Sequence, residues 1–240
     1  LEAIDSYIPH EGIPSEALIK MAKFKTVLDR WIQDNEITGT AIQCWNSVQE
    51  NLGINVCTLM SMMSENLIPS ACETDITGLL SMYTLQLAGN APAILVDWNN
   101  NYASKKDECV LFHCGNFAKS YVPNACMGNA KILATTMGTE NTMGTIEGRV
   151  VGDKMTYARV STDDVNGMIR AYTGEGKFVD DKLDTFGARA VVEIPDLQEL
   201  MHFICLNGFE HHVAIAKENL SDIIVEAFEG YMGWATYLHG

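Results

Sequence analysis

The chain has 240 residues, 47% of them hydrophobic and 20% charged, which is typical of a globular protein that buries a sizeable core. With 16 Lys and Arg against 31 Asp and Glu its net charge is −15, which argues against nucleic acid or an anionic membrane as a partner, because both require clustered cations. Seven cysteines without a CxxC pair, no apolar stretch of roughly 18 residues and no signal-peptide layout indicate a cytoplasmic protein with reduced thiols.

The first hundred residues alternate helix and strand patterns, which is typical of a parallel α/β arrangement. Apolar residues at three- and four-residue steps predict the helices, and short apolar runs predict the strands. Gly89 with Asn90 is expected to close the third helix as a C-cap glycine. The predicted helices cover 15–35, 55–66 and 74–88, and the predicted extended segments cover 40–45, 70–72 and 93–97.

Beyond residue 98, short apolar segments alternate with Gly, Asn and Asp turns, the pattern of an antiparallel sheet or small barrel. A short helix over 196–205, a strand holding His211 and His212, and a final helix over 220–231 complete the chain. The predicted strands cover 109–113, 131–136, 143–151, 154–161, 166–173 and 187–194.

This change in the pattern of predicted elements indicates two domains. Residues 1–92 are predicted to be the C-terminal part of an α/β domain, and residues 93–240 an antiparallel, Greek-key-like β-barrel domain with a few helices. Because the chain opens with Leu1 instead of an initiator Met, we expect that an upstream part is missing.

Acids and histidines lie at the ends of apolar runs that are predicted to be strands or strand-like segments. An unpaired buried charge costs several kcal/mol or more, so such side chains must find partners. Two carboxylates and two imidazoles could satisfy one another by sharing a divalent cation. Oxygen and nitrogen donors suit Mn²⁺ or a similar ion better than a cysteine-rich zinc site does. The candidate ligands are Glu73, Asp97, His113, His211 and His212.

Each candidate also has a purely structural explanation. Glu73 could favour the N-terminal dipole of the following helix, worth about 0.3–1 kcal/mol, although Asp75 serves that purpose at least as well. Asp97 could be a turn residue, but the carboxyl end of a parallel strand is where α/β proteins place ligands. His113 could be a hydrogen-bonded core histidine. His211 and His212 point to opposite faces of a strand, so at most one is expected to face a given site.

A single shared ion sets a geometric condition. With metal–oxygen bonds of roughly 2.0–2.2 Å, the carboxylates of Glu73 and Asp97 must lie within about 8 Å of each other. The spacing of the candidates along the chain matches no short metal motif such as HExxH.

Five segments together resemble the superfamily of L-fucose isomerase and L-arabinose isomerase, and the resemblance runs from about residue 40 to the end. In that family the catalytic half joins the end of an α/β middle domain to a C-terminal β-barrel, which is the division predicted above. The segments are Ala41-Ile-Gln-Cys-Trp45, Ile68-Pro-Ser-Ala-Cys-Glu-Thr-Asp75, Ala93-Ile-Leu-Val-Asp97, Phe112-His-Cys-Gly-Asn116 and His211-His-Val213.

The resemblance implies roles for the candidate ligands of Mn²⁺ or another divalent cation. Glu73 matches the family's metal-binding glutamate, and Asp97 matches the second acid, which is aspartate in the fucose branch. His212 matches the C-terminal histidine ligand, with His211 as the alternative, and His113 matches a histidine ligand of the arabinose branch. Because the residues match both branches of the family, the resemblance does not identify the sugar substrate.

The implied activity is that of an aldose–ketose isomerase, in which Glu73 and Asp97 move protons between C1 and C2 through an ene-diol. Gln43, Trp45 and Trp98 are expected to contact the sugar. Family members have further N-terminal domains, and neighbouring subunits complete their active sites. We therefore expect a homo-oligomer, a trimer or hexamer, and leave open whether 240 residues suffice for activity.

Two other hypotheses remain. The chain could be a catalytically inactive sugar-binding or regulatory relative with the same fold. It could also be a metal-free globular domain in which Glu73 and Asp97 are ordinary helix and turn residues.

Overall fold

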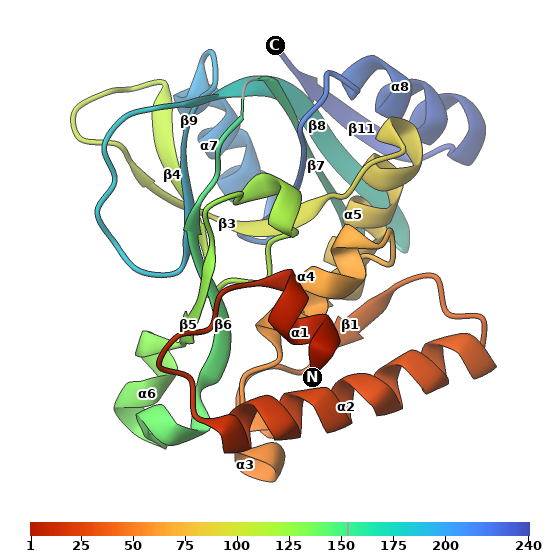
Figure 1. Cartoon of the computed structure of the whole chain (residues 1–240). Coiled ribbons are helices and arrows are strands. Elements are labelled where there is room, and N and C mark those ends of the chain that lie inside the picture. Colours follow the sequence, from red (N-terminus) through yellow and green to blue (C-terminus); the bar gives the residue numbers. More distant parts are fainter. Residues whose placement is uncertain (153) are drawn as a thin grey trace.

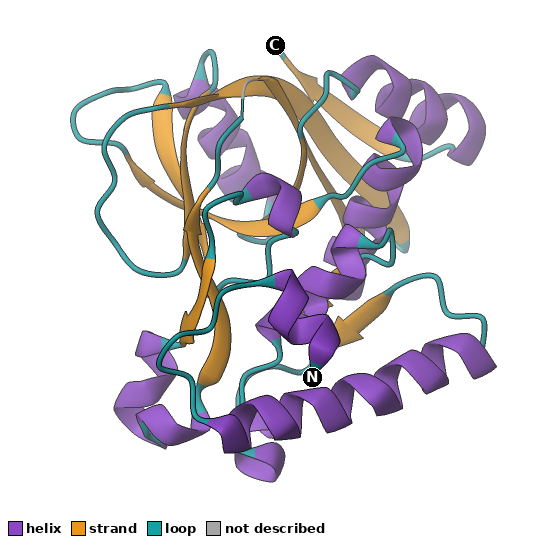
Figure 2. Ribbon diagram, in the orientation of Figure 1, coloured by secondary structure: helices purple, strands orange, loops and turns teal. Residues whose placement is uncertain are grey.

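The structure is a computed structural model that describes residues 1–152 and 154–240. The helices before residue 55 lie at one end of the molecule, and most of the large sheet lies at the other end (Figures 1 and 2). The long helix α2 (Ser15–Asp34) confirms the predicted helix over 15–35, because its apolar positions bury one face. The other helices before residue 70 are α1 (Glu2–Tyr7), α3 (Ser47–Leu52) and α4 (Cys57–Glu65).

A small parallel sheet of β1 (Thr40–Ile42) and β2 (Ser70–Cys72) leads into helix α5 (Ile76–Gly89). Asp75 caps the start of α5, because its side chain accepts a hydrogen bond from the Gly78 N–H. The predicted glycine cap is wrong by one residue. Gly89 is still helical, and Asn90 adopts the left-handed conformation with φ 46°.

The described residues form a second, mixed sheet of nine strands in the order β11-β8-β7-β10-β3-β4-β9-β6-β5, and β8 also pairs with β9. Most neighbours are antiparallel, while β11–β8 and β6–β9 are parallel. The strands are β3 (Ile94–Asn101), β4 (Glu108–His113), β5 (Cys126–Asn129), β6 (Met143–Arg149), β7 (Lys154–Asp163), β8 (Met168–Val179), β9 (Ala188–Glu193), β10 (His212–Ala216) and β11 (Ala235–His239).

The large mixed sheet confirms a mixed α/β class with a sheet-rich second half. The antiparallel Greek-key-like barrel stays a prediction, as does the boundary between 1–92 and 93–240. The predicted helices over 196–205 and 220–231 appear as α7 (Leu197–Asn207) and as α8 (Ser221–Val225), which continues in π-helical form over Glu226–Met232. Two short 3₁₀ turns cover Lys119–Tyr121 and Thr139–Asn141.

Two expectations were wrong. The segment 131–136 is not a strand but helix α6 (Lys131–Met137), in which Leu133 alone is buried, so no alternating buried face exists to pair with a sheet. The strand that carries Asp97 is not parallel to its neighbours, because β3 pairs antiparallel with both β4 and β10. The short connection from β3 to β4 allows only an antiparallel return, since a parallel one needs a long crossover.

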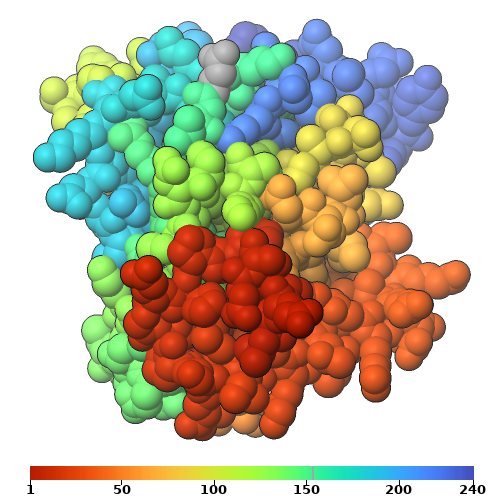
Figure 3. Space-filling model, viewed as in Figure 1, coloured from red at the N-terminus to blue at the C-terminus, as the bar shows by residue number. Residues whose placement is uncertain are grey.

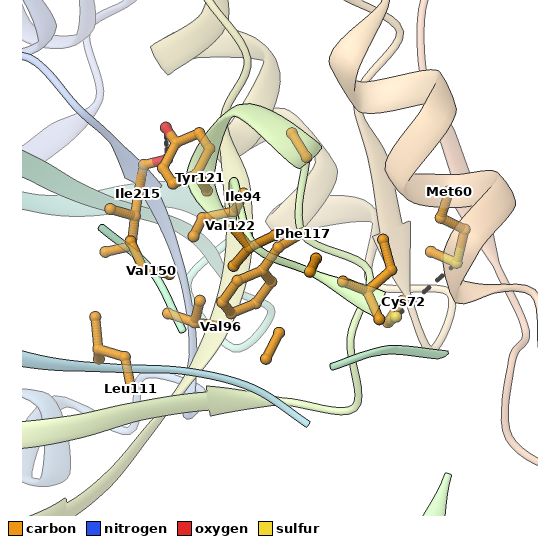
Figure 4. Packing of buried hydrophobic residues seen from close by; sticks show 14 of the residues in the cluster. Met60, Cys72, Ile94, Val96, Leu111, Phe117, Tyr121, Val122, Val150 and Ile215 are labelled. Atoms are coloured by element: carbon orange, nitrogen blue, oxygen red, sulfur yellow. Dashed lines mark hydrogen bonds between the residues drawn. The ribbon is translucent and has the colours of Figure 1, made fainter. Parts of the chain in front are cut away.

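Buried side chains from both halves of the chain form one large core. Met60 and Cys72 belong to the same buried cluster as Phe117, in the loop after β4, and as Val96 and other apolar residues of the large sheet (Figure 4). The buried Tyr121 hydroxyl is satisfied by the carbonyls of Pro92 (2.9 Å) and Ile215 (3.2 Å).

A smaller cluster fixes α5 against β7 and β10. Met82 and Leu85 of the helix pack beside Ala158 of β7 and Ala214 of β10, whose small side chains allow close approach. The start of α5 thereby lies next to the start of β10, which is where the candidate site forms.

The N-terminal residues lie against the region around β5 and α6, as the red and green surfaces in Figure 3 show. The Met127 N–H donates to the Pro9 carbonyl at 2.7 Å. Within residues 1–152 and 154–240, no helix combines the length and apolar character needed to cross a membrane.

Gly115, two residues after the end of β4, provides a test of this packing. It has φ +113°, and a Cβ there would overlap the backbone of Ile146, whereas Gly167 has φ +66° and open space around it. We expect Gly167→Ala to lower the free energy of unfolding by about 1–2 kcal/mol through backbone strain. Gly115→Ala should cost more, because steric overlap is added. Urea unfolding of the intact protein measures the free energy of unfolding of both variants. Equal losses would show that the Ile146 backbone moves to make room for the added Cβ.

Candidate metal and proton-transfer site

The pairing of β3 with β10 places Asp97 directly opposite His212. Side chains of opposed residues in antiparallel strands are neighbours, and the His212 Nε2 lies 3.3 Å from the Asp97 Oδ1. The His212 side chain is only 8% exposed. The strand register therefore creates an acid–imidazole pair from residues far apart in the sequence.

His113, the last residue of β4, adds a second buried imidazole. Its ring centroid lies 5.5 Å from that of His212. The His113 Nδ1 accepts the Cys114 N–H at 2.9 Å, so in the neutral ring the proton is on Nε2. Burial lowers the pKa of His113, which favours this neutral form.

Glu73 reaches the cluster through an unusual turn after β2. Glu73 and Thr74 both have left-handed backbones, with φ 59° and 55°, a conformation that non-glycine residues rarely adopt. The Thr74 N–H donates to the Ile42 carbonyl at 3.3 Å and ties the turn to β1. The Glu73 Oε2 lies 3.9 Å from the His212 Nε2. Such strained turns are typical of functional sites.

His211 lies at the surface of the same cluster. Its side chain is 70% exposed, yet its Nε2 lies 3.5 Å from the Asp97 Oδ1. Strand alternation does not separate the two histidines completely, because His211 precedes the first residue of β10. The structure thus brings all five predicted ligands together and buries His212 rather than His211.

The donor set fits a divalent cation. Glu73, His113 and His212 offer ligand atoms within 4.8 Å of one another, and so do Asp97, His211 and His212. Within this cluster, three buried side-chain atoms have no hydrogen-bond partner: Asp97 Oδ1, His113 Nε2 and His212 Nε2. Unsatisfied polar atoms are costly in a protein interior, and a cation would satisfy the acid and the imidazole of the opposed pair.

The two acids also meet the distance condition for a shared ion. The Glu73 Oε2 and Asp97 Oδ1 lie 3.9 Å and 3.3 Å from the same His212 nitrogen. They are therefore closer to each other than about 8 Å, the limit set by metal–oxygen bond lengths.

The cluster favours positive charge beside its acids. Burial alone would lower the pKa of His212, but the hydrogen bond to Asp75 and the neighbouring Asp97 outweigh it and raise this pKa to about 9. Burial alone would raise the pKa of Asp97, but His212 and His113 lower it. A bound cation would likewise place positive charge beside these acids.

Sequence patterns missed the residues behind His212. The Asp75 Oδ2 lies 2.9 Å from the His212 Nδ1, and Arg159 of β7 binds the Asp75 carboxylate with two nitrogens. Glu210 accepts from the Arg159 Nε at 3.3 Å. The signal was an arginine inside the apolar strand 154–161, because a buried guanidinium needs an acid partner.

The predicted sugar contacts lie in different surroundings. Gln43 is exposed just after β1, and Trp45 is half-buried against the large core. The Trp98 indole N–H donates to the Tyr172 hydroxyl at 2.8 Å, and its ring meets Tyr157 edge-on. Contacts between these residues and a sugar stay predictions.

Comparison with known sequences identifies a family. Residues 111–239 match the family described as "L-fucose isomerase, C-terminal domain". This match covers more than half of the chain. The chain belongs to this family. The matched part of the chain holds His113, His211 and His212, while Glu73 and Asp97 precede it.

Relatives extend the family similarity toward the N-terminus. The chain is 29% identical over 222 residues to a sulfoquinovose isomerase of Priestia megaterium, covering 88% of this chain and 46% of the relative. It is 26% identical over 212 residues to a sulfoquinovose isomerase of Alkalicoccus urumqiensis, covering 86% and 46%. The chain therefore spans about half the length of the curated relatives it matches.

The two neighbouring histidines provide a direct test of the site. We expect His212→Ala to weaken Mn²⁺ binding more than about 100-fold, above the range typical of residues that only support a ligand. His211→Ala should change the affinity by less than about fivefold, since an exposed ion pair is worth about 0–1 kcal/mol. Electron paramagnetic resonance of free Mn²⁺ measures both dissociation constants. A larger loss of Mn²⁺ affinity in His211→Ala than in His212→Ala would make His211 the ligand instead of His212.

Proposed function

We propose that the intact protein is a divalent-metal-dependent aldose–ketose isomerase and that this chain supplies its metal and proton-transfer site. The observation that carries the proposal is the meeting of buried, unsatisfied atoms from three strands or their ends: Asp97 Oδ1 of β3, His113 Nε2 of β4 and His212 Nε2 of β10. Buried polar atoms are usually satisfied within a protein, so three unsatisfied atoms at one place favour a missing ligand. Family membership supports the reaction class.

Glu73, Asp97 and His212 would hold the cation, because the Glu73 Oε2 and the Asp97 Oδ1 lie 3.9 Å and 3.3 Å from the His212 Nε2. When bound, a divalent ion such as Mn²⁺ acts as a Lewis acid that polarises a sugar carbonyl. His113 has its Nε2–H free in the cluster, so in this proposal it donates a hydrogen bond to a sugar oxygen. The His211 side chain is 70% exposed and lies at the surface of the cluster.

The two acids would carry the protons. Aldose–ketose conversion takes a proton from C2 and adds one to C1 through an ene-diol, while O2 loses a proton and O1 gains one. A pair of carboxylates that accept and supply protons suits this exchange. Glu73 approaches from the turn after β2 and Asp97 from β3, so the two acids reach the cluster from separate elements. This separation supports their assignment as the paired proton carriers.

The relatives named sulfoquinovose isomerase make sulfoquinovose the first aldose to test. L-Fucose and L-arabinose are the comparison substrates. We also propose that the intact protein is a homo-oligomer. Three apolar side chains on α5 are exposed, which supports contact of this helix with another subunit: Ile76, Leu80 and Leu87.

Activity of the intact protein tests the proposal. We expect isomerisation of at least one of these aldoses, loss of activity after treatment with a chelator, and recovery with Mn²⁺. Glu73→Gln should lower kcat/KM by about 10²–10⁴-fold, the usual contribution of a general acid–base group. Glu50→Gln, the same change on the exposed end of α3, serves as the control and should retain full activity.

Two outcomes would contradict it. Equal turnover by Glu73→Gln and wild type would remove Glu73 from proton transfer. Sugar binding without turnover, with Mn²⁺ bound, would favour the alternative of an inactive sugar-binding or regulatory relative.

A further inference from the structure

Asp75 contacts His212 on the side of the ring that faces away from the acid cluster. Its Oδ2 lies 2.9 Å from the His212 Nδ1, while the His212 Nε2 faces Asp97 and Glu73. Both ring nitrogens of one buried histidine are thus directed at acids from different elements. Glu73 and Asp97 belong to the proposed site, whereas Asp75 is not needed there as a ligand or as a proton carrier.

The geometry determines which ring nitrogen is available. An ionised carboxylate can only accept hydrogen bonds, so the proton of a neutral His212 ring is held on Nδ1. The lone pair is then on Nε2, which is buried and has no hydrogen-bond partner. A histidine ligand whose second nitrogen donates to a carboxylate is held in one tautomer and one orientation.

Arg159 keeps Asp75 in this role. Its side chain is 2% exposed, its two terminal nitrogens contact the two Asp75 oxygens at 2.5 and 3.1 Å, and its remaining contacts are to Thr77 (2.8 Å) and Glu210 (3.3 Å). Such a two-point contact fixes the plane of the carboxylate. Breaking a buried pair of this kind leaves an uncompensated charge, so the ionised form of Asp75 is favoured.

Gly78 shows how closely the pair is packed. A Cβ at position 78 would overlap the Asp75 carboxylate and approach the Arg159 guanidinium to 3.0 Å. The Gly78 N–H also donates to the Asp75 Oδ1 at 2.8 Å. One carboxylate oxygen therefore caps α5, while the other contacts His212.

We infer that Asp75, held by Arg159, is a positioning residue that presents the His212 Nε2 as a metal ligand. This inference rests on the proposed metal site. It assigns α5 a second role, because the cap of this helix sets the orientation of an imidazole on β10. If Asp75 were only a helix cap, its replacement would change stability and leave metal affinity unchanged.

The test compares Asp75→Asn with a matched buried acid. Glu108 is also buried and ion-paired, with Lys105 at 2.8 Å, but it lies at the opposite end of β4 from His113. In the intact protein we expect Asp75→Asn to raise the Mn²⁺ dissociation constant about 10–100-fold. Glu108→Gln should leave it unchanged, even if both variants lose stability. Excess Mn²⁺ should restore much of the activity of Asp75→Asn, which a folding defect would not allow.

The outcomes separate the two proposals. Failure of the wild-type protein to bind Mn²⁺ overturns the metal site itself. Binding by wild type with equal affinity in Asp75→Asn overturns only the positioning role. If Asp75→Asn does not fold, Gly78→Ala replaces it, because alanine favours the helix while its Cβ displaces the carboxylate. A Gly78→Ala variant with wild-type Mn²⁺ affinity would equally overturn the role of Asp75.

Discussion

The register between β3 and β10 is the constraint on which the site depends. It places Asp97 opposite His212, and the antiparallel partner on the other side of β3 brings His113 beside them. If β10 shifted by one residue in this pairing, His212 would turn to the opposite face of the sheet, away from Asp97. The apolar residues that follow His212 in β10 are fully buried and hold the register, since a slip would expose them or bury polar groups.

The charged side chains in this region form a chain of contacts that runs from the protein interior to the surface. Arg159 compensates Asp75, Asp75 orients His212, and His212 faces Asp97 and Glu73, which are more exposed. The Arg159 guanidinium, the Asp75 carboxylate and the His212 Nδ1 all have partners, whereas the His212 Nε2 and Asp97 Oδ1 have no hydrogen-bond partner. Unsatisfied atoms at the end of an otherwise satisfied network are what a ligand site requires, because a ligand supplies the missing partners.

Periodicity and turn residues predicted most elements, since these signals are local. The apolar spacing of α2 and the short apolar run of β4 both correspond to real elements. The wrong prediction at 131–136 also comes from relying on a local signal. A short apolar segment with one buried side chain fits a helix as well as a strand. The direction of β3 could not be deduced, because strand direction depends on which distant strand becomes its neighbour.

The sequence alone determined which residue types were available: acids and histidines beside apolar runs, whose order resembles one isomerase family. It also determined that they needed partners, because charges next to buried strands are costly. Only the tertiary structure decided that His212 rather than His211 is the buried imidazole, and that Asp75 and Arg159 lie behind it. The reason is physical. Distances between segments separated by more than eighty residues are set by strand register and helix packing, and no local pattern records them.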